Sequence, residues 1–325
     1  MQQVAKELLA GKIVAGFGDE AFDDRQFQLS LIKEIHSKVD IIATGSSRTK
    51  ELRKRYVTNG TKIFFNHAVN GASMEDYIAI LGAYKLYHGY IPKDVILGVD
   101  PWILNKNSGR IRWKNIQKYH DFERQIFPTI TEQRFDTLFI LKKYKELLNY
   151  SYTLANIRYL LKSLKTKKPY YIANDLEVND FLREPDASLH YPYTTRFPNV
   201  QDVYTKALQY TQGYVYGLEN FQDTINKKKF EDILCRLKQE GVHVTLFLAP
   251  YNPLTYDILV KQPKYKLKST EAYFRKVAKN NNLQIIGSYN PHTLHLKEND
   301  FFDGMHCNDR AIKQIFSSWK PANAP

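Results

Sequence analysis

The sequence contains little that would mark a disulfide-rich, membrane-spanning or repeat protein. It has only two cysteines in 325 residues, Cys235 and Cys307, which excludes a disulfide scaffold but does not identify the compartment. No apolar run is long enough to span a bilayer, and Met1 is not followed by a signal peptide. There is no internal repeat, no low-complexity segment and no zinc-finger, bZIP or RNP-type motif. We therefore expect a soluble globular chain, although a chain that had lost an N-terminal anchor would show the same pattern.

The composition favours a large folded core and a basic surface. The chain is 43% hydrophobic, with 23 tyrosines and 18 phenylalanines, so disorder is not expected. Its formal net charge of +13 favours polyanions such as nucleic acid, anionic lipid or an acidic cell-wall polymer. The cations are spread along the chain, so solvated basic surface is the default interpretation and nucleic acid is not the expected partner. Cys235 lies in a helical pattern and is expected to be a core thiol.

Five short apolar runs alternate with helical patterns along much of the chain. The runs cover residues 41–44, 62–69, 94–100, 242–249 and 283–289. This alternation predicts an α/β fold with a five-stranded parallel sheet and right-handed crossovers. Between residues 102 and 217 the alternation stops, and helical patterns appear there (135–150, 154–164 and 202–216) without a clear strand. We expect a single domain over residues 1–325 with a helical insertion or lid at 102–217.

The first apolar run leads directly into Gly45, Ser46 and Ser47. Gly45 permits a sharp turn, and residues 49–56 resemble the first turns of a polar helix. A serine would then stand at the carboxyl edge of the sheet beside a helix N-terminus, where α/β proteins bind ligands and where negative charge is favoured. The alternative is structural, because serines at strand-to-helix turns commonly only cap the helix.

A second candidate group lies near the C-terminus, where Asp303 precedes His306 by three residues in a loop that opens the last helix. The aspartate can accept a hydrogen bond from one imidazole nitrogen, which leaves the other free to take a proton from a serine. In a parallel sheet this loop and the turn formed by Gly45, Ser46 and Ser47 (the serine turn) lie at the same edge. The alternative is an aspartate that caps a turn and a histidine that packs under the helix. A metal site at Asp303, His306 and Cys307 is not expected, because no further ligands occur at metal-site spacing.

These motifs resemble those of the SGNH/GDSL hydrolase superfamily. The resemblance rests on residues 45–47, on Asn70-Gly71 after the second strand, and on Asp303-x-x-His306, and it covers residues 40–101 and 220–320. It implies a flavodoxin-like three-layer α/β/α sandwich and hydrolysis or transfer of acyl esters without a cofactor. The Asp-x-x-His motif is the more specific of these signals, and the serine motif is less so.

The resemblance also implies a role for each matching residue. Ser47 becomes the nucleophile, with Ser46 in place of the family's aspartate. His306 becomes the general base, and Asp303 the carboxylate that orients it. The N–H groups of Ser47 and Gly71 would form the oxyanion hole, with Asn70 beside them.

The chain departs from the family after the third strand. The family usually has Gly-x-Asn-Asp there, with the asparagine as an oxyanion donor, whereas this chain has Gly-Val-Asp-Pro-Trp at residues 98–102. Asp100 therefore stands near the place of a donor, where an ionised carboxylate would repel an oxyanion. Either Asp100 points away from the oxyanion or has a raised pKa, or Trp102, Asn70 or Asn105 supplies the missing donor. Losing one such donor costs ~10²–10³ in rate.

Several further residues are candidates for contact with a substrate. The candidates at the expected sheet edge are Ser46, Arg48, Asp100, Trp102, Tyr251 and Asn252. For Tyr251 and Asn252 an ordinary turn role is an equal alternative. Arg48 has three interpretations: a partner of an acidic substrate, a partner of Asp100, or a surface cation. Trp113 suits a sugar-stacking platform, but buried packing is the more common role of large aromatics.

The Gly-Ser-Ser-Arg sequence and the divergent third motif look like the cell-envelope branch of the superfamily. That branch includes proteins of polysaccharide O-acetylation and of D-alanyl transfer to teichoic acids. The resemblance implies an acylated glycan or other ester as substrate, a membrane-bound acyltransferase as partner, and an extracytoplasmic or membrane-associated location, with a cytoplasmic one as the alternative. The alternative function is a non-catalytic module of the same fold that binds an anionic glycan or a partner protein.

Overall fold

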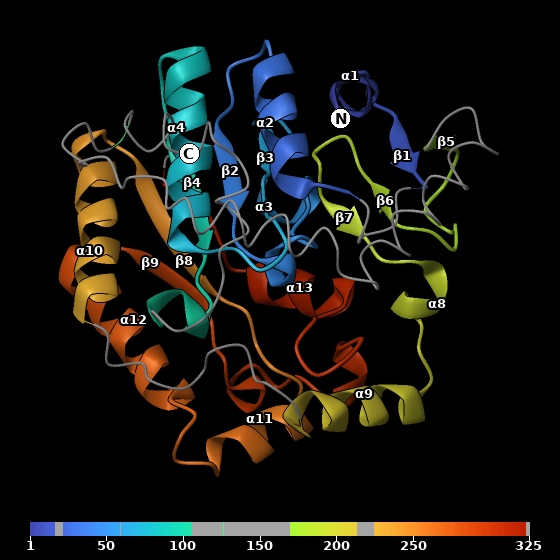
Figure 1. Cartoon of the computed structure of the whole chain (residues 1–325), viewed down its shortest axis with the longest axis vertical. Helices are drawn as coiled ribbons and strands as arrows, with labels where there is room; N and C mark the ends of the chain where they lie inside the picture. The colour runs from blue at the N-terminus through green and yellow to red at the C-terminus, as the bar shows by residue number, and fades with distance from the viewer. Residues whose placement is uncertain (17–21, 59, 106–125, 127–169, 213–223, 323–325) are drawn as a thin grey trace, which may run out of the picture.

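A five-stranded parallel sheet lies at the centre of the computed structural model (Figure 1). The structure describes residues 1–16, 22–58, 60–105, 126, 170–212 and 224–322. The strands are β2 (Ile41–Thr44), β3 (Phe64–Asn66), β4 (Asp94–Gly98), β8 (His243–Leu248) and β9 (Gln284–Gly287), and their order in the sheet is β3-β2-β4-β8-β9. Numbered along the chain, this is the flavodoxin-like order 2-1-3-4-5. The predicted fold class and all five predicted strands are confirmed.

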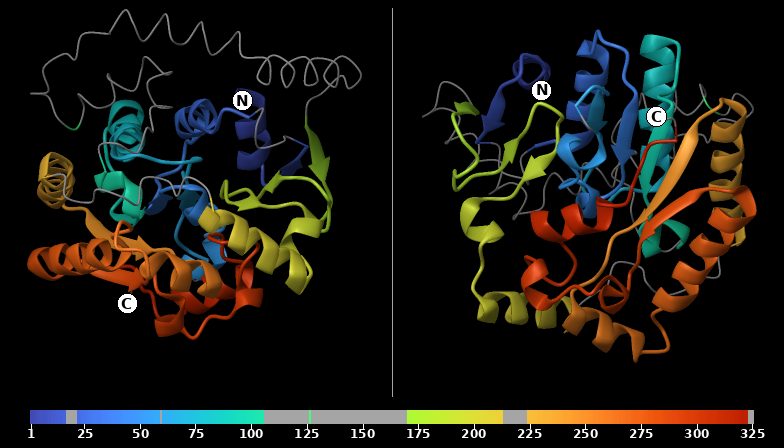
Figure 2. Two further views of the ribbon diagram at one scale, coloured as in Figure 1. Left: turned by 60° about the horizontal axis from the view of Figure 1, so that its bottom comes forward. Right: turned by 180° about the vertical axis from the view of Figure 1, so that it is seen from behind.

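Helices cover both faces of this sheet, which makes a three-layer α/β/α sandwich (Figures 1 and 2). Ile42 and Val95, which pair across β2 and β4, lie in the core on one face, and the alternate residues Ile41 and Ile96 lie in the core on the other. The first face packs on α2 (Asp24–Glu34), α4 (Met74–His88), α10 (Thr224–Gln239) and α12 (Leu267–Asn281), and α1 (Gln2–Leu9) packs against α2. The second face packs on α3 (Lys54–Val57) and α13 (Asp309–Phe316).

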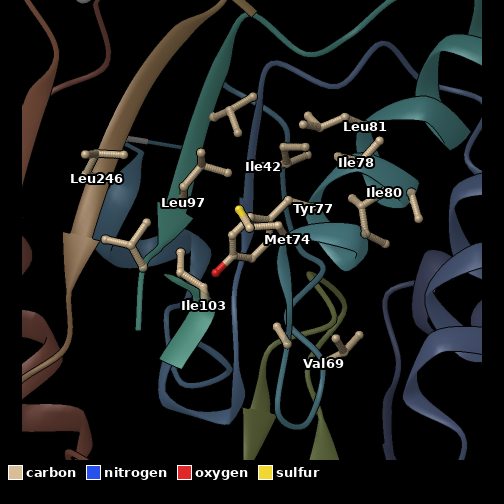
Figure 3. Packing of buried hydrophobic residues seen from close by; sticks show 14 of the residues in the cluster. Ile42, Val69, Met74, Tyr77, Ile78, Ile80, Leu81, Leu97, Ile103 and Leu246 are labelled. Carbon is tan, nitrogen blue, oxygen red and sulfur yellow. The ribbon is translucent and has the colours of Figure 1, made fainter. Parts of the chain in front are cut away.

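The core under α4 connects the sheet to the segments that follow its strands (Figure 3). Leu97 and Leu246 from the sheet pack there with Met74 and Tyr77 of the helix. The hydroxyl of Tyr77 donates a 2.7 Å hydrogen bond to the carbonyl of Gly98. A buried phenol is thus satisfied by the last residue of β4, which fixes the end of the strand.

A second, antiparallel sheet corrects the expectation that residues 102–217 contain no strand. Its order is β5-β1-β6-β7, formed by β1 (Ile13–Ala15), β5 (Tyr171–Ala173), β6 (Leu182–Arg183) and β7 (Leu189–His190). Strands of two or three residues are too short to show the alternation that identifies a strand in a sequence. The helical pattern at 202–216 corresponds to α9 (Val200–Gln212), which follows α8 (Tyr193–Arg196). The patterns at 135–150 and 154–164, and Trp113, lie outside the described residues.

Hydrogen bonds join the small sheet to the segment after the serine turn and to the end of β3. The N–H of Leu189 donates to the carbonyl of Lys50 at 2.9 Å, and the N–H of Asn66 donates to the carbonyl of Asp186 at 2.8 Å. Arg53 is fully buried and its Nε lies 3.0 Å from Oε1 of Glu184. Part of the segment between β4 and α10 therefore packs beside the carboxyl edge of the main sheet.

Two local expectations were wrong, and one helix was not predicted. The helix expected at 49–56 is divided into a 3₁₀ turn, η1 (Ser47–Thr49), and the short α3. The helix α11 (Pro253–Val260) was not expected, although Asn252 caps it and Pro253 opens it, a combination typical of helix starts. Cys235 is exposed on α10 and is not a core thiol.

Three further 3₁₀ segments lie in the described part of the chain. They are η2 (Pro101–Leu104), η4 (Pro291–Leu294) and η5 (Glu298–Asp300). Within the described ranges, none of the helices has the length and apolar character needed to cross a membrane.

Candidate active site

The serine turn occupies the carboxyl end of β2, next to the point where the strand order of the sheet reverses. Open α/β sheets bind ligands at such points. Ser46 is buried and its hydroxyl accepts a 3.2 Å hydrogen bond from the N–H of Arg48, so it caps the 3₁₀ turn. Ser47, the next residue, is only partly buried. The two serines therefore differ: the Ser46 side chain stabilises the turn, whereas Ser47 is partly exposed at the site.

Close packing explains the glycine before these serines. A Cβ on Gly45 would lie 2.4 Å from Oγ1 of Thr49 and 3.0 Å from Cα of Gly98. Gly45 is not among the described residues with positive φ, so the conformational freedom expected of it is not what the turn requires. The absence of a side chain lets β2, β4 and the 3₁₀ turn approach one another.

The structure brings Ser47, His306 and Asp303 together in one hydrogen-bonded series. Ser47 Oγ lies 2.9 Å from Nε2 of His306, and Nδ1 of the same ring lies 2.8 Å from Oδ2 of Asp303. The side chains of His306 and Asp303 are 17% and 34% exposed. With the Nδ1 proton directed to the carboxylate, Nε2 is the acceptor for the serine hydroxyl, which is the arrangement of a serine nucleophile and its general base.

The surroundings of Asp303 favour its ionised form. Burial alone would raise its pKa, but His306 and the N–H groups of Met305 and His306 outweigh this effect and lower the pKa to about 2. Those two N–H groups donate to Oδ1 at 2.8 and 2.9 Å. The carboxylate is thus charged at neutral pH and able to hold the imidazole in one tautomer.

The loop that carries Asp303 and His306, residues 302–306, is held tightly to the rest of the fold. The N–H of Phe302 donates to the carbonyl of His306 at 2.9 Å, and the N–H of Asn252 donates to the carbonyl of Gly304 at 3.1 Å. A Cβ on Gly304 would lie 2.7 Å from Cβ of Tyr210 on α9. The position of His306 therefore depends on both the main sheet and the segment before α10.

The segment that carries Asn70 and Gly71, the predicted oxyanion-hole residues, lies next to the serine turn. The N–H of Val69 donates to the carbonyl of Gly45 at 2.9 Å. Gly71 comes two residues after Val69, so it lies close to the serine turn. Gly71 has φ of 57°, a conformation that favours glycine. Within the described part of the chain, the N–H groups of Ser47 and Gly71 donate to no acceptor. Both are thus available to an oxyanion.

Asn70 is fixed from several sides by buried charged groups. Its N–H donates to Oδ2 of Asp24 at 3.1 Å, its Oδ1 accepts from Nζ of Lys50 at 2.7 Å, and its carbonyl accepts from Nη2 of Arg25 at 3.3 Å. Arg25 is in turn paired with Asp76 at 2.7 Å. The backbone and the side chain of Asn70 together therefore anchor the loop to the rest of the structure.

The six residues expected to contact a substrate are all buried. Their exposed fractions do not exceed 3% for Ser46, Arg48, Asp100, Trp102, Tyr251 and Asn252. Arg48 and Asp100 pair with each other at 2.9 Å. The indole N–H of Trp102 donates to the carbonyl of Ala72 at 3.1 Å, and Asn252 caps α11. The structure places these residues beneath the site, in contact with the backbone segments that form it.

Two residues at the site were not predicted. Tyr191 follows β7, and its ring centroid lies 5.8 Å from that of His306. Asn66, the last residue of β3, donates from Nδ2 to the carbonyls of Thr49 and Leu52 at 2.9 and 2.8 Å. Tyr191 lies in a segment without clear periodicity, so the sequence contained no signal for it. A polar residue in an apolar strand was a usable signal for Asn66.

Among the described residues, no group of three His, Cys, Asp or Glu side chains is arranged to hold a metal ion. Cys307, the third member of the candidate metal set, is buried, and burial raises the pKa of its thiol.

Comparison with protein-family models and with curated protein sequences finds no match to this chain.

Proposed function

We propose that this chain is a serine acyl-ester hydrolase or O-acyltransferase, related to the SGNH/GDSL hydrolases. The observation that carries the proposal is the hydrogen-bonded series from Ser47 through His306 to Asp303, with spacings of 2.9 and 2.8 Å. Its position at the carboxyl edge of a sheet of order 2-1-3-4-5 supports the same conclusion.

The reaction proceeds in two halves. Ser47 Oγ attacks the acyl carbonyl carbon while His306 Nε2 takes the hydroxyl proton, and the oxyanion binds to the N–H groups of Ser47 and Gly71. The tetrahedral intermediate collapses to an acyl-serine, and His306 gives its proton to the departing alcohol oxygen. Water or a sugar hydroxyl then attacks the acyl carbon and passes its proton to His306. When this second tetrahedral intermediate collapses, His306 returns the proton to Ser47 Oγ, which frees the serine and releases the carboxylic acid or the acylated sugar. Asp303 holds the imidazole and stabilises the imidazolium in both halves.

For the substrate we propose an acylated cell-envelope polysaccharide, with a membrane-bound acyltransferase as partner and a location outside the cytoplasm. Support for this part comes from the Gly-Ser-Ser-Arg sequence at residues 45–48 and from the net charge of +13, which suits an acidic polymer.

Steady-state hydrolysis of p-nitrophenyl acetate tests the proposal. Replacement of Ser47 or His306 by alanine should lower kcat by on the order of 10⁴–10⁶, as for other serine triads. The chain offers a matched control in His292, which pairs with Asp257 at 2.9 Å on the surface; His292→Ala should leave the rate unchanged. If Ser47→Ala retained the wild-type rate, the assignment would be wrong, and salt-sensitive glycan binding that is indifferent to Ser47→Ala would favour the non-catalytic module.

A further inference from the structure

The side chain of Arg48, which directly follows the proposed nucleophile, is 1% exposed. It binds four acceptors from beneath the site. Nη1 donates to Oδ1 of Asp100 at 2.9 Å, and Nε donates to the carbonyl of Met305 at 3.1 Å. Nη2 donates to the carbonyl of Pro250 at 2.9 Å and also to that of Ala249. A guanidinium has five N–H donors in a rigid plane, and this site uses donors on all three of its nitrogens.

These acceptors come from three different segments of the fold. Asp100 follows β4, Ala249 and Pro250 follow β8, and Met305 belongs to the loop of residues 302–306. Arg48 itself lies in the 3₁₀ turn after β2. One side chain therefore joins the serine turn to the ends of two other strands and to the loop that carries His306.

The contact with Met305 acts directly on the proposed general base. The peptide group between Met305 and His306 accepts from Arg48 at its oxygen, and its N–H donates to Oδ1 of Asp303 at 2.9 Å. Both sides of this peptide group are thereby fixed, one by Arg48 and the other by the carboxylate that orients the imidazole. A rotation of the peptide would disturb both bonds and displace the ring of His306 from Ser47.

Asp100 provides the charge that such a buried cation requires. An unpaired charge in the interior is costly, and removal of one member of a buried pair destabilises a protein strongly. The ring of Tyr251 lies 4.1 Å from the Arg48 guanidinium and adds a cation–π contact. Asp100 thus has a defined partner at the position where an oxyanion donor was expected.

From these contacts we infer that Arg48 is a positioning residue of the reaction, with Asp100 as its counter-ion. The pair holds the loop of residues 302–306 so that His306 stays within hydrogen-bonding distance of Ser47. The inference rests on the proposed function. Lysine would keep the charge but would present its donors from a single nitrogen, so it could not bind Asp100, Met305 and Pro250 together.

Two measurements on Arg48→Lys test the inference. In p-nitrophenyl acetate hydrolysis, kcat should fall by ~10²-fold, the effect of displacing catalytic groups by about 1 Å, while KM stays within about threefold. In proton NMR, the low-field Nδ1 proton of the His306–Asp303 bond, assigned by its absence in His306→Ala, should be broadened or lost. A core variant far from the site, Leu237→Ala on α10, serves as the control because it lowers stability without touching the loop. It should leave kcat and the resonance unchanged well below its Tm.

Asp100→Asn is the second variant and decides the case if Arg48→Lys does not fold. Asp100→Asn keeps the shape of the side chain but removes the counter-ion of Arg48, so kcat should fall, whereas an asparagine that restored an oxyanion donor would raise kcat. Wild-type kcat and an unchanged resonance in Arg48→Lys, or a raised kcat in Asp100→Asn, would overturn the inference. An inactive wild type would instead overturn the proposed function, and the resonance in Arg48→Lys would still decide the positioning role.

Discussion

Lys50 donates a 2.7 Å hydrogen bond from Nζ to Oδ1 of Asn70 and thereby ties the segment after Ser47 to the loop that carries Gly71. The ammonium is 1% exposed and also lies 2.7 Å from Oδ2 of Asp24. The two proposed oxyanion donors therefore sit on segments joined by a buried charge, so their spacing depends on that charge.

Replacement of Lys50 by methionine is expected to reduce both stability and activity. The change leaves the buried carboxylate of Asp24 without one of its cations, and breaking a buried pair costs about 3–5 kcal/mol. Urea unfolding and p-nitrophenyl acetate hydrolysis measure the two effects. Lys238→Met, at an exposed position on α10, is the control. A loss below about 1 kcal/mol, the range of surface pairs, would show that the network does not hold the loop.

Asp303→Asn is expected to lower kcat by about 10⁴, as in a triad whose histidine is held in the wrong tautomer. The amide is the same size as the carboxylate but presents an N–H₂ group and has no charge to stabilise the imidazolium. The rate of p-nitrophenyl acetate hydrolysis measures the effect, with the surface variant Asp257→Asn as the control. A fall of less than tenfold would mean that His306 does not depend on this carboxylate.

Gly98→Ala is expected to destabilise the protein by about 1–3 kcal/mol through overpacking. The added Cβ would lie 2.0 Å from Oγ1 of Thr49. Because Oγ1 is the closest atom, Thr49→Ala should recover part of the loss in the double variant, although a 3.2 Å contact with Cβ of residue 49 remains. Thermal or urea unfolding of the two single variants and the double variant forms the cycle. Strictly additive losses would contradict the packing explanation.

Acid should destabilise the protein partly through His67. This imidazole is buried between Oε1 of Gln28 at 2.7 Å and the hydroxyl of Tyr84 at 2.8 Å, and burial lowers its pKa to about 3. In the unfolded chain His67 binds a proton below pH ~6.5, whereas in the folded chain it binds one only below about pH 3. Between these values His67 contributes a loss of up to ~1.4 kcal/mol in unfolding free energy per pH unit.

His67→Gln should therefore flatten the dependence of the unfolding free energy on pH between about 6.5 and 3, even if it is less stable at pH 7. Urea titrations at several pH values measure the slope. His292→Gln, at an exposed site, should leave the slope as in the wild type. An identical slope in His67→Gln would show that other groups control the acid response.

The strands of the main sheet were predictable because burial on both faces leaves continuous apolar runs, as at Ile41 to Thr44. The grouping of Ser47, His306 and Asp303 was predictable because Asp303 and His306 follow a short local spacing, and because parallel strands bring their carboxyl ends to one edge. The small sheet was not predictable, since β6 and β7 have two residues each. The central strand β1 pairs with β5 and β6, which lie far from it in the sequence, and contacts such as Arg53 with Glu184 are also long-range.

The burial of Arg48 could not be predicted from local sequence either. A cation after a polar turn is usually on the surface, and only the fold brings Asp100, Pro250 and Met305 to it. Asp100 could be identified from the sequence as unusual at its position, but its partner was one of several alternatives. Long-range contacts, of which the Arg48–Asp100 pair is one, thus account for the part of the site that sequence patterns leave open.

The most direct test of the account is intact-mass analysis and peptide mapping after incubation with a serine-reactive fluorophosphonate. We expect one adduct on Ser47, none on the adjacent Ser46, and loss of labelling in Ser47→Ala and His306→Ala but not in His292→Ala. A wild-type protein that stays unlabelled, or an adduct that persists in Ser47→Ala, would contradict the proposal that Ser47 is an activated nucleophile.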